Sequence, residues 1–440
     1  MRSASLSSPG KVAVILATAV LAIMTPSSQA AALPMAPEEF DTDTDWGEEY
    51  EVPCDPATGE EPELKETPWP QQNMNLDLIH SQNTGLKEDG DPVKVAIIDS
   101  GVNPHPTLGD QVNEFMDPWD DSEDGLCDSV GHGTAVAGII AGGHDDTRFM
   151  GIAPDAEIYS FRLFPEDITD ADPKISASMA WAIHTAINKE VDVINISITA
   201  VSQHELKDAV DRAWDEGIPI VASTGNNGMN MQYAAELGNP DDIVYPAHYD
   251  KTIAVTSYDE EGYWDEGNFG TTVDIMAPGN DVHLPAPEGD GYYTSRGTSF
   301  ATPFVTGAVA LLIGKFGDKA TPGWIKDRLI STTSAAPGGF EDCSGCGHNA
   351  FQGHGALNIH RALTAIGDYG EFSPGENENT AIHADGQLMG EIPAPVDQWK
   401  SERDVAYMVM IGSVLAIAVI YALVKVIPSG RRRGWKPGES

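Results

Sequence analysis

The stretch RGTSFATPFVTGAVALL, residues 296–312, joins a glycine turn to a long apolar run. After Phe300, apolar residues recur at helical spacing, at Val305, Ala308, Val309 and Leu312. This spacing predicts a buried helix that begins at Ser299. The serine has two interpretations. Its hydroxyl can cap the helix by accepting a free backbone N–H, or it can be a nucleophile beside N–H groups that stabilise an oxyanion. The second interpretation requires a base and an orienting acid elsewhere in the chain.

Short apolar runs alternate with helical segments between about residues 72 and 366. The runs VKVAIID, AEIYSFRLF, VDVINISI, IPIVAST and KTIAVTS are typical of buried strands, whereas ISASMAWAIHTAINKE and HELKDAVDRAWDEG have the character of helices. This alternation predicts an α/β fold, with a mainly parallel sheet covered by helices on both faces. In such a sheet the active site lies beyond the carboxyl ends of the strands.

Three polar residues stand where this fold places a site. Asp99 ends the strand VKVAIID, His132 lies between two glycines at the start of an apolar helix, and Asn226 follows the strand that ends in VAST. Taken alone, each has a structural interpretation: Asp99 and Asn226 could simply form turns, and His132 could cap the helix or be a hydrogen-bonded interior residue. Together with Ser299 they supply an acid, a base, an amide donor and a nucleophile. Folding does not require all four, so the combination favours the nucleophile interpretation of Ser299.

Six segments resemble the diagnostic segments of the subtilisin-like serine proteases, peptidase family S8: VAIIDSGV, GHGTAVAGIIAG, VINIS, STGNNG, MAPG and GTSFATPFVTGAVALL. The resemblance covers about residues 93–365 and implies a three-layer subtilisin-like fold without a cofactor. It also implies that Ser299 is the nucleophile, that His132 is the general base and then acid, and that Asp99 orients the imidazole. Asn226 and the backbone N–H of Ser299 would form the oxyanion hole.

The order of segments along the chain, together with the wording VINISITA and GTSFATP, is similar to that of the mycosins, membrane-anchored proteases associated with actinobacterial type VII secretion. The chain departs from them at Val201, where a cysteine is expected, and in CSGC at 343–346. The resemblance implies protein or peptide substrates and a link with a secretion membrane complex. A structural role in that complex, and a general surface protease, are the alternatives.

The resemblance also implies that the segment SITA lines the pocket for the side chain before the scissile bond. Its residues are Ser197, Ile198, Thr199 and Ala200. The common family pattern has two glycines where Thr199 and Ala200 stand, so we expect a narrower pocket and a preference for small side chains. The segment could also be a plain edge strand, which would bind extended peptides by backbone pairing.

The two ends of the chain predict export and anchoring. Arg2 and Lys11 precede an apolar core of about 13 residues, which is short for a membrane span and typical of a cleavable signal. Residues 405–424 carry no charge and precede a basic tail, which predicts a single membrane helix with a cytoplasmic C-terminus and an extracytoplasmic protease domain. The expected order is a signal peptide at 1–30, an acidic extension at 31–71, the protease domain at 72–366, an acidic linker at 367–403, the membrane helix at 404–427 and the tail at 428–440.

Acidic residues dominate the composition, with 68 acidic against 25 basic residues and a net charge of −43. This balance excludes nucleic-acid binding, because phosphate contacts need a basic surface. The acidic loop at 116–128 offers oxygen ligands for a structural calcium ion, but its spacing fits no defined site and an exposed charged loop is the favoured interpretation. No metal is expected.

Four cysteines lie in the part of the chain expected to be exported, where disulfides persist. They allow three pairings. We favour Cys343 with Cys346, and Cys54 with Cys127, a bond that would fix the extension to the protease domain. A zinc site that includes His348 is the alternative.

Overall fold

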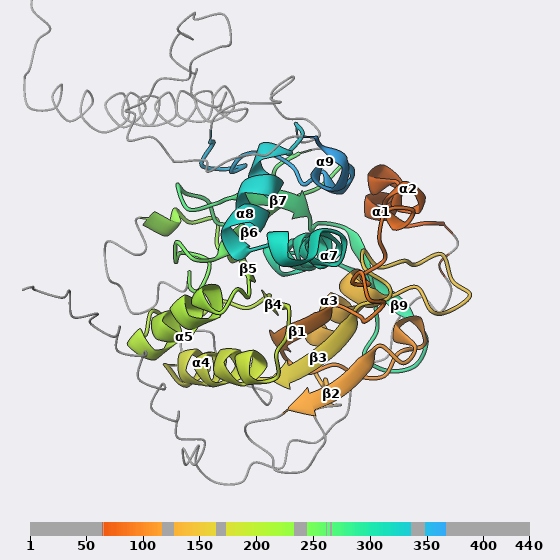
Figure 1. Ribbon diagram of the computed structural model, residues 1–440, viewed down its shortest axis with the longest axis horizontal. Coiled ribbons are helices and arrows are strands. Elements are labelled where there is room, and N and C mark those ends of the chain that lie inside the picture. Colours follow the sequence, from red (N-terminus) through yellow and green to blue (C-terminus); the bar gives the residue numbers. More distant parts are fainter. Residues whose placement is uncertain are drawn as a thin grey trace, which may run out of the picture. The chain divides into compact units, whose positions relative to one another are not determined.

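A parallel sheet of seven strands forms the centre of the fold (Figure 1). The strands are β1 (Lys94–Asp99), β2 (Val112–Met116), β3 (Glu157–Arg162), β4 (Val193–Ile196), β5 (Ile220–Ser223), β6 (Ile253–Tyr258) and β7 (Ile275–Pro278). They are arranged in the order β2-β3-β1-β4-β5-β6-β7, and every neighbouring pair is parallel. The predicted α/β fold with a mainly parallel sheet is confirmed.

The computed structural model describes residues 64, 66–116, 127–163, 173–232, 244–260, 262–264, 266–335 and 348–366. The predicted signal peptide, linker, membrane helix and basic tail lie outside these residues, as does most of the predicted extension. The described residues contain one helix that is long and apolar enough to cross a membrane, at Thr298–Lys319, and 78% of its most apolar window is buried. That helix belongs to the core.

Helices cover both faces of the sheet because successive strand residues point to opposite sides. In β1, Val95 and Ile97 pack in one apolar cluster with α3 (His132–Ala141) and α7 (Thr298–Phe316). Ala96 and Ile98 pack in a second cluster with α4 (Pro173–Asn188) and α5 (His204–Asp215). Figure 1 shows α4 and α5 together on one side of the strands. The result is the three-layer arrangement expected from the sequence.

The remaining elements surround this core. They are the helices α1 (Trp69–Met74), α2 (Leu76–His80), α8 (Pro322–Ser331) and α9 (Ile359–Thr364), the short helices η1 (Pro106–Leu108) and η2 (Gly317–Lys319), and the antiparallel hairpin of β8 (Val282–Pro285) and β9 (Tyr292–Ser295). The boundary predicted between residues 71 and 72 falls inside α1. The indole of Trp69 donates to the carbonyl oxygens of Asn280 at 3.2 Å and Asp281 at 3.1 Å. The packed domain therefore begins before residue 72.

Candidate active site

Asp99 and His132 meet at the carboxyl end of β1. Asp99 is the last residue of that strand and His132 is the first of α3. The distance from Nδ1 of His132 to Oδ1 of Asp99 is 2.7 Å. The side chain of Asp99 is 1% exposed and that of His132 is 23% exposed. The carboxylate thus holds the imidazole through Nδ1, and the second ring nitrogen, Nε2, is the one that can exchange a proton with a nucleophile.

The glycines that flank His132 make this contact sterically feasible. Gly131, before the helix, has a φ of 82°, a left-handed conformation that glycine adopts readily. A Cβ atom at Gly133 would lie 2.0 Å from the carbonyl oxygen of Gly101, which follows Asp99 by two residues. Any side chain at Gly133 would therefore force the start of α3 away from the end of β1.

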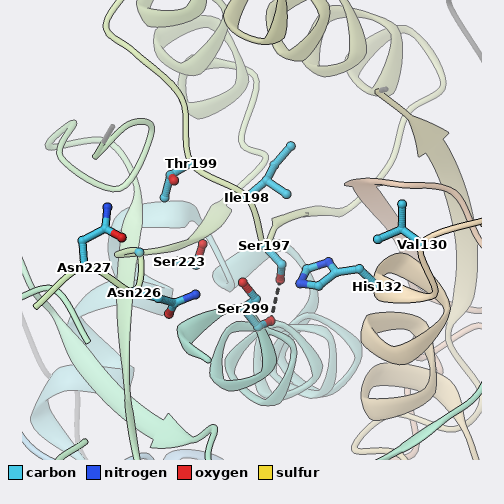
Figure 2. A pocket seen from close by; sticks show the side chains of 10 residues that line it. Val130, His132, Ser197, Ile198, Thr199, Ser223, Asn226, Asn227 and Ser299 are labelled. Carbon is cyan, nitrogen blue, oxygen red and sulfur yellow. Dashed lines mark hydrogen bonds between the residues drawn. The ribbon is translucent and has the colours of Figure 1, made fainter. Parts of the chain in front are cut away.

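Ser299 is the second residue of α7, near its N-terminus. Gly297 occupies the capping position, so the interpretation of Ser299 as the helix cap is wrong. The carbonyl oxygen of Ser299 accepts a hydrogen bond from Oγ of Ser197 at 2.8 Å, which ties the first turn of α7 to the residue after β4 (Figure 2). Ser299 thus lies in the first turn of α7, where backbone N–H groups have no partner four residues earlier in the helix.

Asn226 lies in the loop that follows β5. Its Oδ1 accepts hydrogen bonds from the backbone N of Thr298 at 2.8 Å and from Oγ1 of Thr298 at 2.9 Å. These bonds fix the amide so that its nitrogen points toward Ser299 (Figure 2). An amide donor beside a helix N-terminus is suited to stabilising negative charge on a substrate oxygen.

A single pocket of about 270 Å³ brings these groups together (Figure 2). Its lining residues are Val130, His132, Ser197, Ile198, Thr199, Ser223, Gly225, Asn226, Asn227 and Ser299. Asp99 lies behind His132 and does not line it. An imidazole held by a carboxylate, next to a hydroxyl and an amide donor, is an arrangement for nucleophilic catalysis of acyl transfer.

The segment predicted to form a substrate wall is divided between two environments. Ser197, Ile198 and Thr199 line the pocket, whereas Ala200 is buried and does not. Ala200 instead pairs with Tyr245: each backbone N–H donates to the other's carbonyl oxygen, at 2.7 and 3.1 Å. The segment continues beyond the end of β4 and forms an isolated bridge at Ala200, so backbone pairing with an extended peptide, as by an edge strand, stays a prediction.

Sequence reasoning missed several residues of the site. Val130, Ser223 and Asn227 also line the pocket. Asp128 is buried beneath it, four residues before His132 in the stretch DSVGHGT, and accepts hydrogen bonds from around the histidine. The signal available in the sequence was a charged residue directly before a glycine-rich helix start.

The described part of the chain contains no group of three His, Cys, Asp or Glu side chains that could hold a metal ion. Most of the acidic loop at 116–128 lies outside the described residues. Cys127 is disulfide-bonded. Cys54, Cys343 and Cys346 lie outside the described residues, so the two pairings stay predictions. Nε2 of His348, the residue considered for zinc, lies 2.8 Å from the carbonyl oxygen of Val273.

Comparisons with known proteins agree with this geometry. Residues 90–355 match the model of the subtilase family of peptidases. Subtilisin NAT of Bacillus subtilis subsp. natto is 31% identical over 305 residues, which cover 67% of this chain and 71% of that protein. Subtilisin BL of Lederbergia lenta is 32% identical over 274 residues, covering 61% of this chain and 91% of the relative.

Solved structures of two mycosins have a fold similar to that of this chain. The crystal structure of MycP1 from Mycobacterium smegmatis is 25% identical with a TM-score of 0.60, and the alignment covers 74% of this chain and 91% of that one. The structure of MycP3 protease from the type VII (ESX-3) secretion system is 27% identical with a TM-score of 0.56, and the alignment covers 71% of this chain and 92% of that one. The chain belongs to the subtilase family, its structural relatives include these mycosins, and it is a subtilisin-like serine endopeptidase.

Proposed function

We propose that this endopeptidase cleaves peptide bonds with Asp99, His132 and Ser299 as its triad. Ser299 Oγ attacks the carbonyl carbon of the substrate while Nε2 of His132 takes the hydroxyl proton. His132 then gives that proton to the leaving amine, and an acyl-enzyme remains on Ser299. A water molecule then attacks the acyl carbon while His132 takes its proton. His132 passes that proton to Oγ of Ser299, and the carboxylic acid product is released. Asp99 holds the imidazole through Nδ1 and stabilises its charged form.

The oxyanion that forms in each step is stabilised by two donors. One is the side-chain amide of Asn226 and the other is the backbone N–H of Ser299 in the first turn of α7. The observation that carries the proposal is the 2.7 Å contact between His132 and Asp99, with that histidine lining the same pocket as Ser299 and Asn226.

The pocket supports a preference for small side chains before the scissile bond. A Cβ atom placed on Gly225 would lie 3.4 Å from Cγ2 of Thr199, so the threonine methyl reaches across toward the opposite wall. The two walls of the slot are formed by 197–199 and by 223–226, and the methyl narrows the space between them. Alanine, glycine or serine fits such a slot better than leucine or an aromatic residue.

The protease acts outside the cytoplasm and is held to the cell membrane by residues 404–427, with its signal peptide removed. Its link with type VII secretion rests on the likeness to MycP1 and MycP3 and on the segment order of the sequence. Its substrates are secreted proteins or peptides. The disulfide of Cys127 is made with Cys54 and fixes the extension at 31–71 to the protease domain.

The proposed chemistry is tested by labelling the full-length protein with a fluorophosphonate, a reagent that reacts with activated serines. Wild type should be labelled and Ser299→Ala should not. Ser331→Ala is the matched control, because Ser331 is an exposed serine at the end of α8 and does not line the pocket. Labelling that survives in Ser299→Ala would refute the assignment of the nucleophile. A folded wild type that resists the reagent would favour a structural role in a secretion complex.

A further inference from the structure

Asp128 is a buried carboxylate just behind the pocket, and the mechanism above does not use it. It is 0% exposed. An ionised carboxylate has only acceptor sites, so its burial is costly unless donors surround it. The residues around Asp128 supply these donors, and every one of them belongs to the segments that carry His132 or Asp99.

The first two donors come from the turn before His132 and from the residue at the end of β1. Oδ1 of Asp128 accepts from the backbone N of Gly131 at 2.7 Å and from Oγ of Ser100 at 2.8 Å. Gly131 immediately precedes His132, and Ser100 immediately follows Asp99. One carboxylate oxygen therefore joins the two neighbours of the charge pair.

The other carboxylate oxygen fixes the first turn of α3. Oδ2 accepts from the backbone N of Thr134 at 2.8 Å and from Oγ1 of Thr134 at 2.6 Å. The backbone N of Gly133 donates to Oγ of Ser100 at 3.0 Å. The carboxylate of Asp128 is thus hydrogen-bonded, directly or through Ser100, to residues 131, 133 and 134. His132 lies between the first two of these.

Ser100 connects this network with Asp99. Its backbone N donates to Oδ1 of Asp99 at 2.8 Å, and that oxygen also contacts His132. Its hydroxyl proton is directed to Asp128 at 2.8 Å in preference to Asp99 at 3.3 Å. Burial raises the pKa of Asp128, and the hydrogen bonds from Thr134 and Ser100 oppose that effect.

We propose that Asp128 is a positioning residue that holds the imidazole of His132 on Asp99 by fixing both ends of the turn that carries the histidine. The inference rests on the proposed triad. His132 is the first residue of α3 and lies between two glycines, so the reacting geometry depends on what anchors this start of the helix. A small displacement of a reacting group lowers the rate far more than it lowers stability.

The test is Asp128→Asn in the full-length protein. The amide keeps one acceptor oxygen and places an NH₂ group against fixed N–H donors of Gly131 or Thr134, so the turn must shift. We expect the second-order rate constant for labelling by a fluorophosphonate to fall about 10- to 100-fold. The downfield proton resonance of His132 Nδ1–H, which reports its hydrogen bond to Asp99, should weaken or move upfield. Asp99→Asn assigns that resonance.

The matched control is Asp274→Asn. Asp274 is also a buried carboxylate. It accepts from the backbone N of Ala254 at 2.8 Å and lies 2.9 Å from Nζ of Lys326, but it immediately precedes β7 and does not line the pocket. This variant should lose stability and keep both the labelling rate and the His132 resonance. It therefore separates a loss of fold from a loss of positioning.

The inference is overturned if folded Asp128→Asn labels at the wild-type rate with an unchanged His132 resonance. Ser100→Ala provides a second variant should Asp128→Asn not fold, because it removes only the bridging hydroxyl. It should slow labelling by a smaller factor, and an unchanged rate would again contradict the inference. A wild type that does not react would instead refute the proposed function, so the two failures are distinguishable.

Discussion

Asn226 is oriented by Thr298, the residue next to Ser299: its Oδ1 accepts from both the N and the Oγ1 of that threonine, at 2.8 and 2.9 Å. The side-chain oxygen is therefore fully occupied, and the amide nitrogen is directed to the pocket. The proposed donor for the oxyanion and the proposed nucleophile are placed by the same turn of α7.

Replacing Asn226 by Asp should leave the contacts with Thr298 in place and remove the donor. We expect kcat to fall by about 10²- to 10³-fold with little change in KM, the scale known for one oxyanion-hole donor of a subtilisin. Steady-state cleavage of a peptide with alanine before the scissile bond measures this. Thr298→Val is the companion variant and should cost less, since one of the two bonds to Oδ1 remains. Equal kcat in wild type and Asn226→Asp would exclude the amide from the oxyanion hole.

Asp99→Asn should reduce kcat by about 10⁴-fold, because an amide in place of the carboxylate favours the wrong tautomer of His132. The fold should remain, since the backbone N of Ser100 can still donate to the remaining side-chain oxygen. Asp110→Asn, at an exposed acidic position, serves as the control and should retain full activity. Activity of Asp99→Asn within tenfold of wild type would contradict the proposed triad.

Thr199→Gly should widen the pocket by removing the methyl that approaches Gly225. In a peptide library, wild type should favour alanine, glycine and serine before the cut, and the variant should gain at least about tenfold for leucine relative to alanine. Labelling by a small fluorophosphonate should change little, because that reagent does not fill the slot. A wild type that prefers leucine or aromatic residues would refute the assigned wall.

His105 makes stability depend on pH. It is buried, its Nδ1 accepts from the backbone N of Thr107 at 3.1 Å, and its Nε2 lies 3.1 Å from the carbonyl oxygen of Gly291. Burial lowers the pKa of His105, and the hydrogen bond with Gly291 and the charges of Asp145 and Asp290 oppose that effect. The unfolded chain therefore takes up a proton near pH 6.5 while the folded chain does not, so stability falls as the pH drops below that value, by at most about 1.4 kcal/mol per pH unit for one histidine.

Denaturant unfolding of the Ser299→Ala variant between pH 7.5 and 5 measures this slope without self-digestion. Adding His105→Asn should make the slope shallower, because asparagine can still cap η1 through Thr107 and does not titrate. Four further, half-buried histidines also have a pKa lowered by desolvation and keep part of the slope: His80, His184, His248 and His354. An identical slope with and without His105 would refute its contribution.

Two glycines in helices should respond in opposite ways to alanine. A Cβ atom on Gly307 in α7 would lie 2.5 Å from Cβ of Ile152, whereas one on Gly323 in α8 would find its nearest neighbour, Trp214, at 3.7 Å. We expect Gly307→Ala to lower the free energy of unfolding by about 1–3 kcal/mol through overpacking. Gly323→Ala should leave it unchanged or raise it by up to about 1 kcal/mol. Denaturant unfolding compares the two, and a neutral Gly307→Ala would show that the contact with Ile152 relaxes.

The sheet and the positions of Asp99, His132 and Ser299 could be predicted because each follows from local pattern. A continuous apolar run such as 95–98 is typical of a strand buried on both faces, and its last residue lies at the edge where a site forms. Helix starts are marked by glycines before apolar runs. Pattern fixes the first residue of a helix less closely: the helix predicted to begin at Ser299 begins at Thr298, with Gly297 in the capping position.

The parts that could not be predicted depend on residues distant in the sequence. Ala200 leaves the pocket because Tyr245 pairs with it, and no local signal specifies that partner. The role of Asp128 depends on Ser100, which reaches it only when the end of β1 and the start of α3 come together. An acidic residue in a polar stretch otherwise resembles an exposed loop residue.

The helix α7 packs against α3 and against β4, β5, β6 and β7, and it carries Ser299 at its start. A chain emerging from the ribosome exposes Asp99 and His132 early, whereas Ser299 follows only with α7, more than 160 residues after His132. Chains that stop before α7 therefore lack the proposed nucleophile. Proteolytic activity therefore cannot begin before α7 has been synthesised and has packed into the core.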